Sequence, residues 1–213
     1  EAHGADVLRL YVASLDYADD IRMSEKGIKE ASEAYRKIRN TFRFQLSTLF
    51  DFNAATDAVP VEKMDALDRW VLHKTSELVT QCTEAYDAYE YHRVQQLCNQ
   101  FCSSTLSAVY HDILKDRLYT LAKNAPLRRS SQTAIHEVFT TLVKLLAPVL
   151  TFTADEAWSF ATSGREYSEG CIHLENWPAP AASWHNPTLD AQVATLLAVR
   201  AKVNEAPEPA RQS

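Results

Sequence analysis

Apolar side chains recur every three or four residues along most of the chain, which is the pattern of amphipathic helices. Long helices are predicted over residues 24 to about 50, 63–89, 91 to about 123, and from residue 130 or 131 to Pro148. Shorter helices are predicted over residues 6–14, from Thr153 through Trp158, and from Leu189 to about residue 203. Long helices joined by short loops favour an all-α, up-and-down helical bundle.

Capping residues and prolines set the predicted helix ends. Ser24 is a suitable N-cap, and Thr153 with Glu156 three residues later has the pattern of a capping box. Pro126 is expected to end the helix before it, and Pro148 to end or kink its own helix.

Polar residues, glycines and prolines predict the irregular segments. Residues 51–61 are expected to form a loop, and residues 162–187 an irregular stretch in which Cys171–Leu174 is extended. The tail with Pro207 and Pro209 is expected to fray. The expected division is a connector with an opening helix (1–22), a core bundle (23–161), and an irregular segment with a final helix and tail (162–213).

Residues 35–44 concentrate positive charge in a helix of an acidic chain. Residues 33–43 contain four basic residues and one acidic residue, whereas the whole chain has a net charge of −6. Because residues three and four apart are neighbours on a helix, Arg36, Asn40 and Arg43 line up on one face. Phosphate contacts supply much of nucleic-acid affinity, so this face is a candidate RNA site. The alternative is an ordinary solvated face.

The bulk composition is that of an ordinary globular protein. The 213 residues are 46% apolar and 23% charged, and the presence of only 4 glycines favours helices over a turn-rich β fold. No apolar run is long enough to span a membrane, and no signal peptide is visible, so no membrane partner is expected. The chain begins with Glu rather than Met, and we expect it to be a fragment of a longer protein.

Neither a disulfide framework nor a metal site is predicted from the cysteines, which are Cys82, Cys98, Cys102 and Cys171. Cys98 and Cys102 could bind zinc together with His92 or His111, but the usual Cys-x-x-Cys spacing is absent. Buried free cysteine is the favoured interpretation.

Several segments resemble class I aminoacyl-tRNA synthetases, and their combination is similar to the bacterial isoleucyl type. Residues 4–10, Gly-Ala-Asp-Val-Leu-Arg-Leu, resemble the element that follows the catalytic domain and opens the anticodon-binding bundle in that family. The later matches, in the same order as in the family, are residues 12–17, 35–41, 67–72, 115–119, 145–150, 152–156, and 173–174 with 177–178. Single segments are shared with valyl and leucyl relatives.

The resemblance implies a bundle that docks the anticodon stem and loop of tRNA(Ile). The residues that fall on its basic or matching segments, and are therefore candidates for RNA contact, are Arg36, Lys37, Arg39, Asn40, Arg43, Arg69, Trp70, Lys115 and Arg117. Asp6 and Arg9 match the opening element, where we expect a structural role at a helix start or a contact to the missing catalytic domain.

Three of these candidates have structural alternatives. Trp70 is favoured as a core residue rather than an RNA contact. Lys115 and Arg117 could instead form pairs within their helix with Asp112 or Asp116.

The same resemblance implies that this fragment is inactive by itself. The synthetase needs a Rossmann domain with a His-x-Gly-His motif and a Lys-Met-Ser-Lys-Ser loop for ATP, and no His-x-Gly-His occurs here. Residues 21–26 superficially resemble the second motif, but they follow the Gly-Ala-Asp element instead of preceding it. No cofactor is expected in the fragment, whereas the parent enzyme uses ATP and Mg. The expected partners are tRNA(Ile) and the missing catalytic and editing domains, in a cytoplasmic monomer.

Two other function classes compete with RNA binding. A helical protein-interaction bundle would leave the basic face as solvated surface. A metal-binding bundle enzyme would need Glu-x-x-His motifs, and none occurs. Binding through phosphates must weaken steeply as salt rises, which separates RNA binding from an apolar interaction surface.

Overall fold

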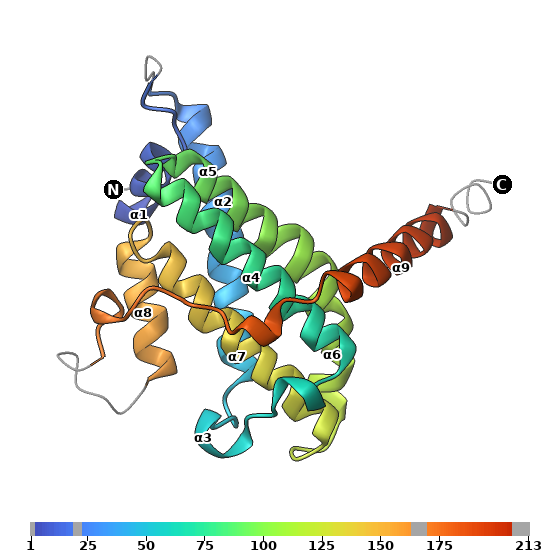
Figure 1. Ribbon diagram of the computed structural model, residues 1–213. Coiled ribbons are helices and arrows are strands. Elements are labelled where there is room, and N and C mark those ends of the chain that lie inside the picture. The colour runs from blue at the N-terminus through green and yellow to red at the C-terminus, as the bar shows by residue number, and fades with distance from the viewer. Residues whose placement is uncertain (1–2, 19–22, 163–169, 206–213) are drawn as a thin grey trace.

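Long helices pack side by side in an all-α bundle (Figure 1). The computed structural model describes residues 3–18, 23–162 and 170–205, and no strand occurs in these ranges, which confirms the predicted fold class. The helices are α1 (Gly4–Ala13), α2 (Glu25–Thr48), α3 (Ala54–Asp57), α4 (Ala66–Asp87), α5 (Tyr91–Gln100), α6 (His111–Thr120), α7 (Pro126–Leu146), α8 (Thr151–Ala161) and α9 (Pro187–Glu205). A π-helical segment, η2 (Phe101–Tyr110), joins α5 to α6, and short 3-10 turns occur at η1 (Val61–Lys63), η3 (Ile172–Leu174) and η4 (Ala182–Trp184).

One continuous core lies between α2, α4, α7 and the α5–η2–α6 helix. The rings of Phe42 and Phe139 meet edge to face with centroids 5.8 Å apart, which joins α2 to α7. Helix α4 runs beside α5 and η2, and α9 extends away from the bundle (Figure 1). This packing leaves the polar side of α2 facing solvent, so the fold exposes the basic segment.

Side-chain caps explain where α2 and α4 begin. Ser24 Oγ accepts a hydrogen bond from the Gly27 amide at 3.1 Å, so the N-cap prediction is confirmed. Asp65 caps α4 in the same way, through the Leu67 amide at 3.1 Å. Each cap satisfies one of the amides that lack a partner within the first helical turn.

Two predicted helix boundaries are wrong. Pro126 does not end the preceding helix but is the first residue of α7, where a proline costs nothing because that amide has no helical partner. Thr153 is not an N-cap, since α8 already begins at Thr151. The Thr153 hydroxyl instead donates to Asp6 of α1 at 2.6 Å.

Two irregular segments and one long helix also differ from expectation. Residues 51–61 contain the short helix α3, and Ile172–Leu174 forms a 3-10 turn where an extended segment was expected over Cys171–Leu174. The helix predicted from residue 91 is continuous to Thr120, but its middle third is π-helical. The predicted fraying of the tail falls on residues outside the described ranges.

Candidate nucleic-acid interface

The exposed side of α2 carries the positive charge that the sequence predicts. This helix has six basic and three acidic residues, within a chain of net charge −6. Five of the predicted RNA contacts lie on it and all are exposed: Arg36, Lys37, Arg39, Asn40 and Arg43. The fold therefore brings these five together at helical spacing on one solvent-facing surface, which we call the α2 basic face.

The cations of the α2 basic face differ in how far they are neutralised. Arg36 pairs with Glu33 of the same helix, and Arg39 lies 4.0 Å from Glu156 of α8. Within the described ranges, no carboxylate oxygen lies within 4.0 Å of the charged nitrogens of Lys37 or Arg43. Exposed ion pairs are weak, so Arg36 and Arg39 can exchange a carboxylate for a phosphate at little cost, and Lys37 and Arg43 have no carboxylate to exchange.

A shallow cavity of about 390 Å³ extends this surface toward α5. Lys26, Lys29 and Lys37 line it from α2, and Asn99 lines it from α5. Two glutamates of α2 also lie there, so the cavity has a net charge near +1. The buried Asn99 Oδ1 has no hydrogen-bond partner among the described residues.

The candidates on α4 point inward. Trp70 is buried, and its indole Nε1 donates a hydrogen bond to Asp190 of α9 at 2.9 Å. This contact fits the core role that the sequence favoured for Trp70. Arg69 is half-buried, and its Nε has no hydrogen-bond partner in the described part of the chain.

The candidates on α6 are engaged with aspartates. Lys115 pairs with Asp112 at 3.0 Å, which is the intrahelical alternative considered for it. Arg117 reaches another helix instead, where it donates to the Asp65 carboxylate at 3.0 Å and lies 3.8 Å from the buried Asp68. Neither residue adjoins the α2 basic face, and Arg117 is tied to the start of α4.

Sequence reasoning missed a buried polar cluster formed by two arginines of α7. The Arg128 guanidinium donates to both carboxylate oxygens of Asp51, at 2.8 and 3.0 Å. Arg129 donates to the Asp51 backbone carbonyl at 3.0 Å, and the Gln132 amide donates to the Asp51 carboxylate at 2.7 Å and to the Thr48 carbonyl at 2.9 Å. We call these contacts the Asp51 clamp. It fastens the end of α2 to α7. The only signals for it in the sequence are an aspartate just after α2 and two consecutive arginines near the start of α7.

A second polar cluster combines a histidine with two carboxylates. Ligand atoms of His73, Glu77 and Asp190 lie within 4.8 Å of one another. The Asn186 amide, however, donates to His73 Nδ1 at 3.2 Å, so the neutral imidazole carries its proton on Nε2. That nitrogen, 3.5 Å from a Glu77 oxygen, therefore has no free lone pair for a metal. The Lys74 ammonium also lies 3.5 Å from Asp190, so the cluster is best described as an ion-pair network joining α4 to α9.

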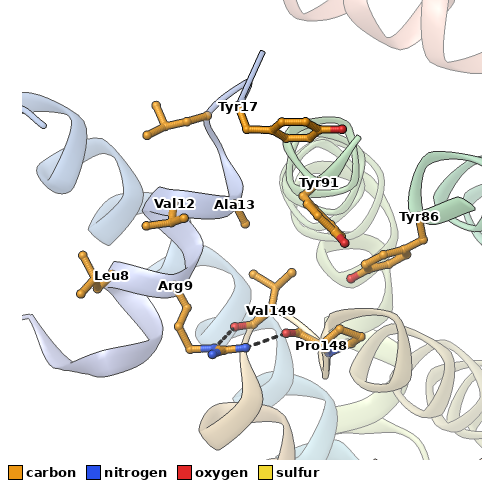
Figure 2. Close-up of a pocket in the computed structure, with 10 residues that line it drawn as sticks. Leu8, Arg9, Val12, Ala13, Tyr17, Tyr86, Tyr91, Pro148 and Val149 are labelled. Carbon is orange, nitrogen blue, oxygen red and sulfur yellow. Dashed lines mark hydrogen bonds between the residues drawn. The ribbon is translucent and has the colours of Figure 1, made fainter. Parts of the chain in front are cut away.

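The opening element forms a structural clamp and one wall of an apolar pocket. Arg9 donates to the carbonyls of Pro148 and Val149, at 2.8 and 2.9 Å (Figure 2). The Asp6 carboxylate accepts from the Thr153 amide at 2.7 Å, so together the two residues hold the turn from α7 to α8. This outcome matches the structural role expected for them.

Beside that clamp, a pocket of about 700 Å³ opens between α1 and the start of α5. Figure 2 shows Tyr86 and Tyr91 facing Val12 and Arg9 across it. Leu8 and Val12 of α1 are exposed, although both are apolar. Arg9 is the only cation among the described residues that line the pocket, and its guanidinium already donates to two carbonyls, so the pocket is unsuited to a polyanion.

Three of the cysteines, Cys82, Cys98 and Cys102, are buried and free, as expected, and Cys171 is half-buried. The sulfurs of Cys82 and Cys98 lie 3.8 Å apart. Burial raises the pKa of the Cys102 thiol to about 12, so it stays protonated at neutral pH. No described helix has the length and apolarity needed to cross a bilayer.

Comparisons with known proteins agree with this architecture. The family described as "Anticodon-binding domain of tRNA ligase" matches residues 68–212. Isoleucine–tRNA ligase from Desulfitobacterium hafniense (strain DSM 10664 / DCB-2) is 44% identical over 209 residues, which cover 98% of this chain and 22% of that protein. The corresponding ligase from Thermotoga maritima is 42% identical over 213 residues, covering 100% of this chain and 23% of that protein. The chain thus spans about a fifth of the length of these curated relatives.

A solved structure shares the fold at low sequence identity. LeuRS from Agrobacterium radiobacter K84, in a ternary complex with tRNA and LeuAMS, aligns with a TM-score of 0.61 and 16% identity. The alignment covers 87% of this chain and 20% of that chain. At this identity the likeness concerns the fold alone.

Proposed function

Because this chain belongs to the family of anticodon-binding domains of tRNA ligases and is homologous to isoleucine–tRNA ligases, we propose that it binds the anticodon stem and loop of tRNA(Ile). The observation that carries the proposal is the α2 basic face, which is exposed on an otherwise acidic chain. Phosphates would contact Arg36, Lys37, Arg39 and Arg43, and Asn40 would bond a ribose or a base edge. Arg69, Trp70, Lys115 and Arg117 lie away from this face and would contribute to it indirectly.

The proposal extends to a longer protein, because the matched relatives are about five times the length of this chain. We propose that the chain works within a cytoplasmic isoleucine–tRNA ligase, presenting tRNA to a catalytic domain that uses ATP and Mg. The bundle alone would bind RNA weakly and discriminate little between tRNAs, since the helix face recognises phosphates and sequence is read from unstacked loop bases.

Replacing Arg36 and Arg43 together by alanine tests the α2 basic face. We expect the affinity for an isoleucine tRNA to fall by about tenfold or more, because a hydrogen bond to a charged group contributes roughly 1.5–3 kcal/mol. The slope of log K against log salt should also become shallower by about two, one for each lost phosphate contact. Fluorescence anisotropy at two or more salt concentrations measures both quantities.

The matched control replaces Arg93 and Arg200, two exposed arginines on α5 and α9, by alanine. This variant changes the net charge equally but should keep the wild-type affinity and salt slope. Equal losses in both double variants, or binding that ignores salt, would favour the protein-interaction bundle over RNA recognition.

The apolar pocket beside α1 supports a second part of the proposal, namely contact with another domain of the ligase. Leu8 and Val12 are exposed in the bundle alone, yet they sit one helical turn apart on a hollowed apolar surface. The chain spans about a fifth of the length of its relatives, so the remaining domains of the ligase would pack against it through apolar surfaces of this kind.

Changing Leu8 and Val12 to aspartate should therefore act only in the full-length ligase. In the isolated chain we expect the free energy of unfolding to change by less than about 0.5 kcal/mol, because both side chains face solvent. In the full-length enzyme the two charges should weaken interdomain packing and speed cleavage in limited proteolysis. Unchanged proteolysis of the full-length variant would show that no domain covers this pocket.

A further inference from the structure

Phe50 is the most exposed large apolar side chain among the described residues, at 80% of its full accessible surface. It lies two residues beyond the end of α2 and seven residues after Arg43. Helix α2 rises by roughly 1.5 Å per residue, so its last residue lies about 7–8 Å beyond Arg43, and Phe50 follows in the turn at that end of the α2 basic face. Single exposed apolar residues are common, and exposure alone carries no function.

The turn that carries Phe50 is, however, held from both sides. Before it, the Thr48 carbonyl accepts from the Gln132 amide at 2.9 Å. After it, the Asp51 carboxylate and carbonyl are bonded by the Asp51 clamp, and the Phe52 ring packs on His136 with centroids 5.7 Å apart. The Phe52 amide also closes the turn on the Leu49 carbonyl at 3.0 Å. The backbone is thus fixed in a form that keeps the Phe50 ring in solvent.

A rigidly presented aromatic ring next to a phosphate-binding face has the chemistry of a base-stacking platform. Proteins that recognise unpaired RNA stack its bases on aromatic side chains, while basic residues track the backbone. A ring fixed in advance binds at a smaller entropic cost than one that must be ordered on contact. An apolar protein partner would not need the row of cations that leads to Phe50.

We propose that Phe50 stacks on one unpaired base of the bound RNA loop, while the α2 basic face holds the phosphates of the adjoining stem. This inference rests on the proposed function and adds the residue at which the bundle distinguishes a loop from a paired stem. The ligand is an unpaired nucleobase, and the stacking itself is tolerant of base identity.

Two RNA hairpins with the same stem test the proposal. One has a seven-nucleotide unpaired loop, and the other is closed by a compact UUCG tetraloop. We expect Phe50→Ala to weaken binding of the seven-nucleotide loop by roughly 5- to 150-fold, the range given by stacking of one base. Binding of the tetraloop hairpin should stay within about twofold of wild type. Placing 2-aminopurine at each loop position in turn should show fluorescence quenching at one position with wild type and none with Phe50→Ala.

Three further variants separate stacking from other effects. Phe50→Trp should keep or increase the preference for the open loop, whereas Phe50→Leu, which is apolar but cannot stack, should lose it. Phe160→Ala removes a phenylalanine of α8 that is 67% exposed, and should bind both hairpins like wild type.

The outcomes distinguish the stacking role of Phe50 from RNA binding by the α2 basic face. If both hairpins bind in a salt-sensitive way but Phe50→Ala loses neither or both equally, the stacking role is overturned and the proposed function stands. If neither hairpin binds at low salt, the proposed function fails and the role of Phe50 fails with it.

Discussion

Replacing Asp51 by alanine is expected to lower the free energy of unfolding by about 3–5 kcal/mol, the usual cost of removing one partner of a buried ion pair. The Asp51 side chain is only 8% exposed and receives hydrogen bonds from Arg128 and Gln132. Without its carboxylate, the buried Arg128 guanidinium keeps only carbonyl and amide oxygen acceptors. Urea unfolding followed by circular dichroism measures the loss.

An exposed pair provides the control for this prediction. Lys115→Ala removes the ion pair with Asp112 on the surface of α6 and should cost at most about 0.5 kcal/mol. If Asp51→Ala cost no more than this control, the Asp51 clamp would contribute nothing specific to the bundle.

The Asp51 clamp should also make stability depend on pH in the acid range. Hydrogen bonding from Arg128, reinforced by Gln132 and the nearby positive charges, lowers the pKa of Asp51 below its ordinary value of 3.8. A carboxyl whose pKa is lower in the folded state contributes stability above the unfolded value, and this contribution is lost as the pH falls through the folded value. Between pH 5 and pH 2, wild type should therefore lose more stability than Asp51→Ala, and their curves should converge.

Much of the fold follows from signals within short stretches of sequence. The 3.6-residue periodicity predicts the long helices, and Ser24 predicts the start of α2 because an N-cap acts on amides three residues away. The family resemblance drawn from collinear segments is confirmed by the matches to isoleucine–tRNA ligases.

The errors occur where a distant contact replaces a local one. Thr153 and Glu156 have capping-box spacing, but Asp6 of α1 supplies the cap because it lies beside the start of α8. Pro126 could end one helix or begin the next, and the sequence alone does not distinguish these positions.

The sequence is limited in the same way when it is used to predict which charged residues are exposed. Arg43 and Arg128 are the same residue type in helical segments, yet one is exposed on α2 and the other is buried against Asp51. Helical spacing places a residue on a face but does not reveal which neighbour covers that face. The α2 basic face was therefore predictable, while the Asp51 clamp and the presentation of Phe50 required the structure.

The second large effect is expected at Asp68, which is fully buried in α4. Its carboxylate accepts hydrogen bonds from the Tyr110 hydroxyl at 2.7 Å and from Ser130 and Ser131 at 2.6 and 3.2 Å. Asp68→Ala leaves these hydroxyls without their acceptor and Arg117 without a charge 3.8 Å away. Since each buried unsatisfied group costs roughly 1–3 kcal/mol, a loss of about 3–5 kcal/mol in the free energy of unfolding is expected.

Asp68→Asn separates the hydrogen bonds from the charge. The asparagine oxygen can still accept from Tyr110, and its amide can donate to a rotated serine hydroxyl, so the loss should be smaller, about 1–2 kcal/mol. An asparagine variant as unstable as the alanine variant would show that the charge, and not the hydrogen-bond geometry, holds α4 to η2 and α7.

The pH dependence at Asp68 should have the opposite sign to that at Asp51. Burial raises the pKa of Asp68 above 3.8, although bonds from Ser130 and Tyr110 oppose the shift. The folded state then holds its proton more tightly than the unfolded state, so this carboxyl favours folding at low pH and loses that contribution as the pH rises from 3.8 through its folded value. Asp68→Asn cannot titrate, so the stability of wild type relative to this variant should fall as the pH rises through that window. Urea unfolding of both proteins from pH 3 to pH 7 measures the difference, and a relative stability that rises with pH would mean that the pairing with Arg117 outweighs the cost of burial.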